Sequence, residues 1–126
     1  LPTPPPARID PADAANTIER MRSGERRAIS SVITELERLS AAAPVLLQHL
    51  QPHLGRAIVI GFTGPPGAGK STLVNAVIET LRKQQRSVGV IAVDPSSPIS
   101  GGAILGDRIR MTSALDDDGV FVRSLA

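Results

Sequence analysis

The sequence contains no cysteine, tryptophan or tyrosine, and only two of its 126 residues are phenylalanine. The lack of cysteine excludes disulfides, thiolate metal sites and thiol nucleophiles. Hydrophobic residues make up 41% of the chain, so a core must be built from isoleucine, valine, leucine and alanine. This composition is typical of buried parallel strands and the helices that cover them, in a chain with the length of one ordinary domain.

Strong charge and long apolar runs are absent as well. The formal net charge is +2 at pH 7, and arginines alternate with acidic residues, so broad nucleic-acid binding is not indicated. No apolar run approaches the roughly 18 residues of a membrane span, and the start, LPTPPPARIDP, lacks the basic and apolar regions of a signal peptide. We expect a protein that binds neither nucleic acid nor membrane and lies in the cytoplasm, or in the mitochondrial matrix if the source is eukaryotic.

The first 55 residues predict a proline-rich tail followed by helices. Residues 1–9 are expected to be extended or disordered, because prolines cannot donate backbone hydrogen bonds or enter a helix interior. Asp10 followed by Pro11 is typical of a helix start, and this helix is expected to end near Gly24. A helix over residues 25–42 is predicted by a stripe of apolar residues at spacings of three and four. The stripe consists of Ile29, Val32, Ile33, Leu36 and Leu39.

Residues 10–55 are therefore interpreted as a helical N-terminal extension, with a third, short helix from Pro44 through Leu50. Its neighbours His49 and His53 have no carboxylate or cysteine at ligand spacing, so a surface position is favoured over a metal site. A solvated helix surface is likewise favoured over an anion site for a group of four arginines. They are Arg20, Arg22, Arg26 and Arg27.

From residue 56 to residue 126 the pattern changes to that of an α/β protein. The β-branched run AIVIGFT predicts a buried strand over 57–63, and apolar spacing predicts a helix over 70–85. A second strand is predicted over 87–93. This order predicts a right-handed βαβ unit of a parallel sheet. VFVRSLA at 120–126 begins a third strand, which suggests the first part of a longer domain.

Between the first strand and its helix lies the pattern GxxxxGK(S/T), which is typical of a phosphate-binding loop. Its glycines allow positive φ and a close approach of the backbone to oxygen atoms, and its N–H groups face an anion at a helix N-terminus. A lysine adds a charge for the β- and γ-phosphates, and a hydroxyl offers a hard oxygen to Mg²⁺. The candidate nucleotide-binding residues are Gly64, Pro65, Pro66, Gly67, Ala68, Gly69, Lys70, Ser71 and Thr72.

Two aspartates and two arginines follow the second strand. Asp94 stands at its carboxyl end, where parallel sheets collect ligands, and could order a metal-bound water. Asp107 could also face the metal, and a helix cap or turn role is open for both. Arg108 and Arg110 could stabilise transition-state charge. Lys70, Asp94 and Asp107 are thus the candidate catalytic residues, and Ser71 with both aspartates forms the candidate metal set.

Three segments together resemble the MeaB-like, or ArgK-type, GTPases, which protect adenosylcobalamin-dependent methylmalonyl-CoA mutase. They are GFTGPPGAGKSTL, AVDPSSPISGGAILGDRIRM and VFVRSLA, and the resemblance runs from about Asp10 to Ala126. It implies a P-loop G domain of the SIMIBI class with a helical extension, Mg²⁺-dependent hydrolysis of GTP to GDP, and a homodimer. It also implies a complex with the mutase in which nucleotide state gates loading and protection of the cofactor. Carried over, Lys70 holds phosphate, Ser71 binds Mg²⁺, and Asp94 and Asp107 are metal or water ligands in switch I.

Family members are more than twice as long, so the segments that read guanine and form the dimer would lie beyond Ala126. Two alternatives to the GTPase chaperone therefore stay open. One is an ATP-dependent kinase of the arginine/ornithine transport type. The other is a non-catalytic nucleotide-binding fragment.

Overall fold

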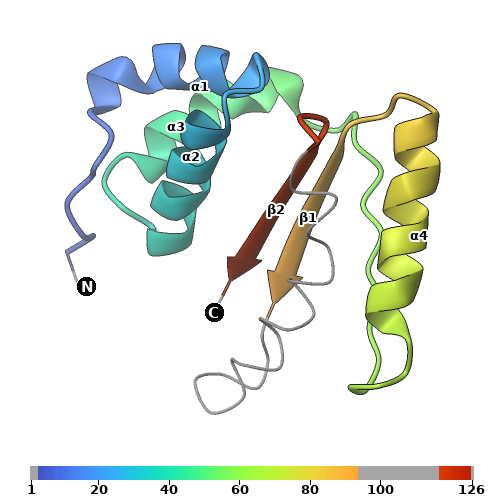
Figure 1. Ribbon diagram of the computed structural model, residues 1–126. Coiled ribbons are helices and arrows are strands. Elements are labelled where there is room, and N and C mark those ends of the chain that lie inside the picture. The colour runs from blue at the N-terminus through green and yellow to red at the C-terminus, as the bar shows by residue number, and fades with distance from the viewer. Residues whose placement is uncertain (1–2, 94–116, 126) are drawn as a thin grey trace. The chain divides into compact units, whose positions relative to one another are not determined.

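The computed structural model describes residues 3–93 and 117–125 (Figure 1). The chain forms two compact units with a boundary between Val59 and Ile60. In the described ranges no helix has the length and apolar character needed to cross a membrane. The candidate residues Asp94, Asp107, Arg108 and Arg110 lie outside the described residues.

The first unit is helical. It contains the 3₁₀ turn η1 (Pro11–Asp13), the helices α1 (Ala14–Arg22), α2 (Arg26–Arg38) and α3 (Ala43–Leu50), and the 3₁₀ turn η2 (Gln51–His53). Asp10 caps η1, since its Oδ1 accepts a hydrogen bond from the Ala12 N–H at 3.0 Å. The three helices predicted from the sequence are thus confirmed, with ends that differ by a few residues.

The core of the helical unit is closed by side chains from all three helices. Its fully buried members are Ala14, Ile18, Val32, Ala42 and Leu46. Leu39, which the apolar stripe placed on the buried face, is instead 72% exposed. The reason is that α2 ends one residue earlier, and Leu39 adopts a left-handed conformation with φ +51° as its C-cap. Of the rest of the stripe, Val32 is buried in the core and Leu36 packs against it, whereas Ile29 and Ile33 are partly exposed and are not members of this cluster.

A buried carboxylate fastens the proline-rich segment to α2. Glu35 is 1% exposed, and its Oε2 accepts hydrogen bonds from the N–H groups of Arg8 at 3.0 Å and Ile9 at 3.3 Å. Ser40 Oγ donates to the same oxygen at 2.9 Å, and Arg38 Nη1 donates to Oε1 at 3.0 Å. Residues 3–9 form neither helix nor strand. Their backbone is nonetheless held in place by side chains of the helical unit.

Burial by itself would raise the pKa of the Glu35 carboxyl. The hydrogen bonds from Ser40, Ile9 and Arg8, together with the positive charge of Arg38, outweigh burial and hold this pKa below its ordinary value. The charged form of Glu35 is therefore the form that the fold stabilises.

The second unit is a small α/β layer. The helix α4 (Lys70–Lys83) leads to β1 (Val88–Val93), which pairs in parallel with β2 (Val120–Leu125). The register runs from Val88 opposite Val120 to Val93 opposite Leu125. Ile78 of α4 and Val120 form the buried centre. The side chains packed around them are Val74, Val88, Val90 and Val122.

An ion pair joins the end of α4 to the turn before β2. Arg82 Nε and Nη2 donate to the two carboxylate oxygens of Asp117 at 2.8 and 2.9 Å, and Nη1 donates to the Arg86 carbonyl at 2.7 Å. The hydrogen bonds to Asp117 raise the pKa of the Arg82 guanidinium, and the loss of solvent lowers it. The effect of Asp117 is the larger, so this pKa lies above its ordinary value. A Cβ built on Gly119 would collide with this guanidinium, so a side chain there would require the end of Arg82 to move.

The strand predicted over residues 57–63 is not present, and that prediction was wrong for the described structure. The described sheet consists of β1 and β2 alone. Ile58, Val59 and Ile60 are 83%, 91% and 59% exposed. A strand is stable only when neighbours satisfy its backbone and bury its side chains, and neither condition is met here. The expected parallel arrangement is confirmed for β1 and β2.

Candidate phosphate-binding loop

The loop between residues 64 and 69 ends at an uncapped helix N-terminus. Gly69 is the N-cap of α4 and offers no side chain to its N–H groups. The hydrogen bond from the Leu73 N–H to the Gly69 carbonyl at 3.0 Å closes the first helical turn. The N–H groups of Lys70, Ser71 and Thr72 lie in the first turn, so they have no acceptor within the helix. Donors at the positive end of a helix dipole favour an anion.

Two glycines give the loop its shape. Gly67 has φ +82°, and Gly69 has φ +86° with ψ 12°. This left-handed region is costly for residues with a Cβ. At both positions a Cβ would meet no atom within 4 Å, so glycine is needed for its backbone conformation and not for space.

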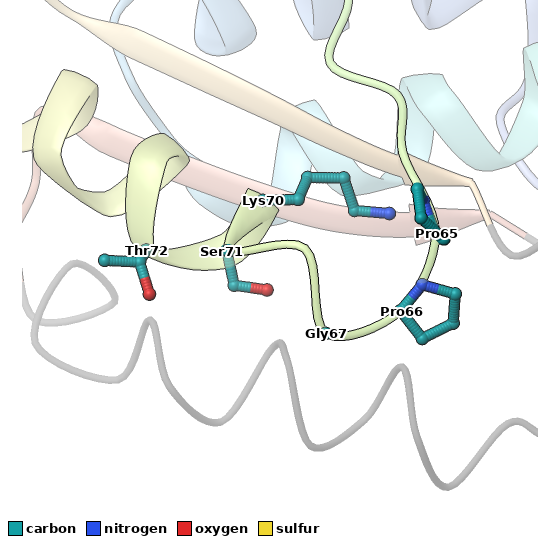
Figure 2. A pocket seen from close by; sticks show the side chains of 7 residues that line it. Pro65, Pro66, Gly67, Lys70, Ser71 and Thr72 are labelled. Carbon is teal, nitrogen blue, oxygen red and sulfur yellow. The ribbon is translucent and has the colours of Figure 1, made fainter.

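Lys70 lies over the concave side of the loop. Its Nζ is 3.4 Å from the Gly64 carbonyl oxygen, to which it donates a hydrogen bond. Figure 2 shows the lysine side chain extending from the start of α4 back towards Pro65. Ser71 is buried and Thr72 is exposed. The ammonium group and the helix N-terminus are thus presented by the same short stretch of chain.

The loop encloses a hollow of about 40 Å³. Its lining residues are Pro65, Pro66, Gly67, Gly69, Lys70, Ser71 and Thr72. Sites that enclose a whole small molecule measure roughly 300–1,000 Å³. The loop therefore suits one charged group of a ligand, such as a phosphate, and not an entire nucleotide.

The donor chemistry of the loop fits a hard cation shared with phosphates. The Ser71 hydroxyl is an oxygen ligand of the kind that Mg²⁺ takes beside phosphate oxygens and water. Across residues 3–93 and 117–125 there is no group of three or more histidine or acidic side chains able to hold a metal. An ion here would depend on the ligand's phosphates, with Ser71 as the protein's contribution from the described residues.

One element of the loop was not indicated by the motif. The Ala68 N–H donates to the Pro65 carbonyl at 3.3 Å and closes a four-residue turn. A signal for it exists in the sequence, because Pro66 followed by Gly67 is typical of the central pair of a type II turn. The contact of each loop residue with a nucleotide stays a prediction, as do the roles of Asp94 and Asp107, which lie outside the described residues.

Comparison with known proteins gives a family match. The family described as methylmalonyl Co-A mutase-associated GTPase MeaB matches residues 26–126. A Pyrococcus horikoshii protein, provisionally named as a GTPase, is 51% identical over 109 residues, which are 86% of this chain and 34% of that protein. GTPase ArgK of Escherichia coli is 41% identical over 119 residues, which are 91% of this chain and 36% of the length of ArgK.

A third relative is built differently. The fused isobutyryl-CoA mutase of Cupriavidus metallidurans is 43% identical over 118 residues, which are 90% of this chain and 11% of that protein. This chain spans about a third of the length of the two GTPases above. The similarity covers both the helical unit and the phosphate loop, since it extends over nine-tenths of the chain.

Proposed function

The chain belongs to the MeaB family of methylmalonyl-CoA mutase-associated GTPases, and on that premise we propose that its loop 64–72 binds the phosphates of GTP and GDP together with Mg²⁺. The observation that carries this proposal is the uncapped N-terminus of α4 with Lys70 lying over it. A GTPase needs such a set of donors, because phosphoryl transfer depends mainly on positioning and on stabilisation of charge.

Each residue has a separate task in this proposal. The N–H groups of Lys70, Ser71 and Thr72 donate to phosphate oxygens, and the Lys70 ammonium leaves the Gly64 carbonyl to contact the β- and γ-phosphates. The Ser71 hydroxyl would hold Mg²⁺. That ion, when bound, supplies charge neutralisation at the phosphates.

We propose that hydrolysis requires a protein of the relatives' length. By resemblance, Asp94 and Asp107 would order a metal-bound water, and Arg108 or Arg110 would stabilise negative charge in the transition state. The matched residues make up about a third of each relative, so binding without turnover is the second candidate for the chain by itself. Measurable GTP hydrolysis by the 126-residue chain would eliminate that candidate.

The partner is proposed from the relatives. A segment similar to this chain is part of a fused isobutyryl-CoA mutase, which supports association of the longer protein with an acyl-CoA mutase. We therefore propose that it acts as a G-protein chaperone in loading and protecting the mutase cofactor, as a homodimer in the cytoplasm. Copurification of the longer protein with its mutase, dependent on GTP, tests this part.

Replacing Lys70 tests the phosphate loop directly. Lys70→Ala should weaken binding of a fluorescent GDP analogue with Mg²⁺ about 100-fold, on the scale of a lost charged hydrogen bond of ~3 kcal/mol. Lys83→Ala is the matched control, because it removes the same charge at the exposed end of the same helix. Titrations with GDP and ADP analogues compare guanine with adenine.

The outcomes separate the candidates. Equal affinities of Lys70→Ala and the parent chain would refute the phosphate-loop assignment. A preference for the adenine nucleotide, with transfer of phosphate to arginine, would replace the GTPase by a kinase.

A further inference from the structure

The turn at residues 65–68 has a definite type. The Ala68 N–H donates to the Pro65 carbonyl at 3.3 Å, so Pro66 and Gly67 are its two central residues. Proline fixes φ of Pro66 near −65°, and Gly67 has φ +82°. A negative φ followed by a positive φ at these positions defines a type II turn, because types I and I′ require equal signs.

We propose that Pro66 is a positioning residue that holds the empty phosphate loop in the shape that receives a phosphate group. The proposal deepens the function proposed above and rests on it. Pro66 is not a ligand, since a proline nitrogen carries no hydrogen. Its ring limits the conformations of the unbound loop and so lowers the entropy lost when the loop is ordered around an anion.

The geometry on both sides of the turn supports this role. Since Pro65 and Pro66 lack N–H groups, the next backbone donor of the loop after Gly64 is that of Gly67. The turn directs the chain from there through Gly69, with φ +86°, into the N-terminus of α4. On the other side, the contact from Lys70 Nζ to the Gly64 carbonyl at 3.4 Å joins the two ends of the loop. The described loop is thus closed by contacts among its own residues.

The lining of the hollow gives a second reason. Both prolines and Gly67 line the same hollow of about 40 Å³ as Lys70 and Ser71. Pro66 is exposed, so its ring contributes little to a hydrophobic core. Its effect must come through backbone conformation, and this effect can be separated from overall stability.

The test compares two proline variants of the 126-residue chain. Pro66→Ala should weaken binding of magnesium pyrophosphate and of a fluorescent GDP analogue by the same factor, about two- to fivefold, which corresponds to the free energy by which a well-placed proline usually stabilises a fold. Pro65→Ala makes the same chemical change at the first position of the turn, whose φ the turn does not fix. It should weaken binding less than Pro66→Ala does.

Amide hydrogen exchange in the empty chain gives a readout that does not depend on the ligand. Pro66→Ala should accelerate exchange of the Ala68 N–H and leave that of the buried Ile78 unchanged. A general loss of stability would accelerate both. Gly67→Ala strains the turn where a Cβ meets no atom within 4 Å, so it should weaken pyrophosphate binding about 5- to 30-fold through φ alone.

Each result decides between definite alternatives. If the parent chain binds both ligands and Pro66→Ala binds them equally well, the positioning role is wrong and the proposed function stands. An effect of Pro65→Ala as large as that of Pro66→Ala would also refute it. If the parent chain binds neither pyrophosphate nor the nucleotide, the proposed function itself fails.

Discussion

The two units of the chain differ in how completely each covers its own apolar side chains. In the helical unit, α1, α2 and α3 enclose a core in which Ala14, Ala42 and Leu46 are fully buried. Among the described residues of the second unit, the buried cluster consists of Ile78 and Val120. Ile91 and Val93 of β1 remain 54% and 64% exposed. Within the described ranges, the helices bury a shared core, whereas the sheet has one face packed against α4 and one exposed face.

The two faces of β1 also differ from each other. Along β1, half-buried and exposed residues alternate, and α4 packs on the half-buried set. Parallel sheets are usually covered on both faces, and the apolar exposed set of VGVIAV suits such cover. The same reasoning applies to residues 57–63. Helices can bury a stripe against each other locally, whereas a parallel strand needs neighbours distant in sequence.

The largest expected effect is in the helical core. Leu46→Ala should lower the free energy of unfolding by about 3 kcal/mol, because it opens a cavity among well-packed side chains. Leu47→Ala removes the same atoms from a side chain that is 48% exposed and should cost less than half as much. Urea denaturation followed by circular dichroism measures both. Equal losses would contradict the closed core.

The next effect concerns Glu35, whose carboxylate binds the proline-rich segment through the N–H groups of Arg8 and Ile9. Glu35→Gln should cost about 2 kcal/mol, because charged hydrogen bonds to buried donors are replaced by weaker ones and the amide brings an unmatched donor. Glu37→Gln on the exposed side of α2 is the control. Amide exchange of Arg8 and Ile9 should accelerate only in Glu35→Gln. Unchanged amide exchange of Arg8 and Ile9 in Glu35→Gln would show that Glu35 does not hold the segment.

The same residue predicts a dependence on pH. The folded chain holds the Glu35 pKa below the ordinary 4.5, so the folded state binds fewer protons there than the unfolded state. The stabilisation is complete above pH 4.5 and is lost as the pH falls through the folded pKa. The difference in stability between the parent chain and Glu35→Gln should therefore shrink below pH 4.5. A constant difference down to pH 3 would contradict this assignment.

The smallest effect is expected on the uncovered face of the sheet. Ile91→Thr keeps a β-branched side chain at an exposed position and should change stability by less than about 0.5 kcal/mol. The same change at buried Ile78 should cost about 2–3 kcal/mol. Thermal unfolding of the two variants compares the faces. A large loss for Ile91→Thr would mean that this face is covered within the chain.

The elements that the sequence predicted well are those fixed by local signals. Asp10 and Pro11 marked a helix start, and apolar spacing located α2 and α4 because a helix satisfies its backbone within one segment. The run at 57–63 has strand composition but lacks a neighbour among the described strands. Leu39 matched the stripe, yet the helix had already ended. Burial of Glu35 was missed because its four partners lie up to 27 residues away, and no local pattern records them.

For the candidate site, the motif predicted which residues form the loop, since each has a stereochemical role. Gly67 and Gly69 occupy positive φ, as the function of such loops requires. The motif does not encode the turn at 65–68, which depends on the identity of its variable positions. Asp94 and Asp107 were placed from strand order and from resemblance to the family, and their roles stay predictions.

The ion pair between Arg82 and Asp117 lies at the start of the pairing between the two strands. Asp117 lies in the turn whose Gly119 carbonyl accepts a hydrogen bond from the Val88 N–H at 2.8 Å, at the first rung of the ladder. A slip of β2 by one residue would move Asp117 by about 3.3 Å and so break its contact with the guanidinium. It would also turn alternate side chains of β2 to the opposite face of the sheet. Gly119 leaves the guanidinium room to hold both oxygens. The observed register is thus one in which Arg82 of α4 can pair with Asp117.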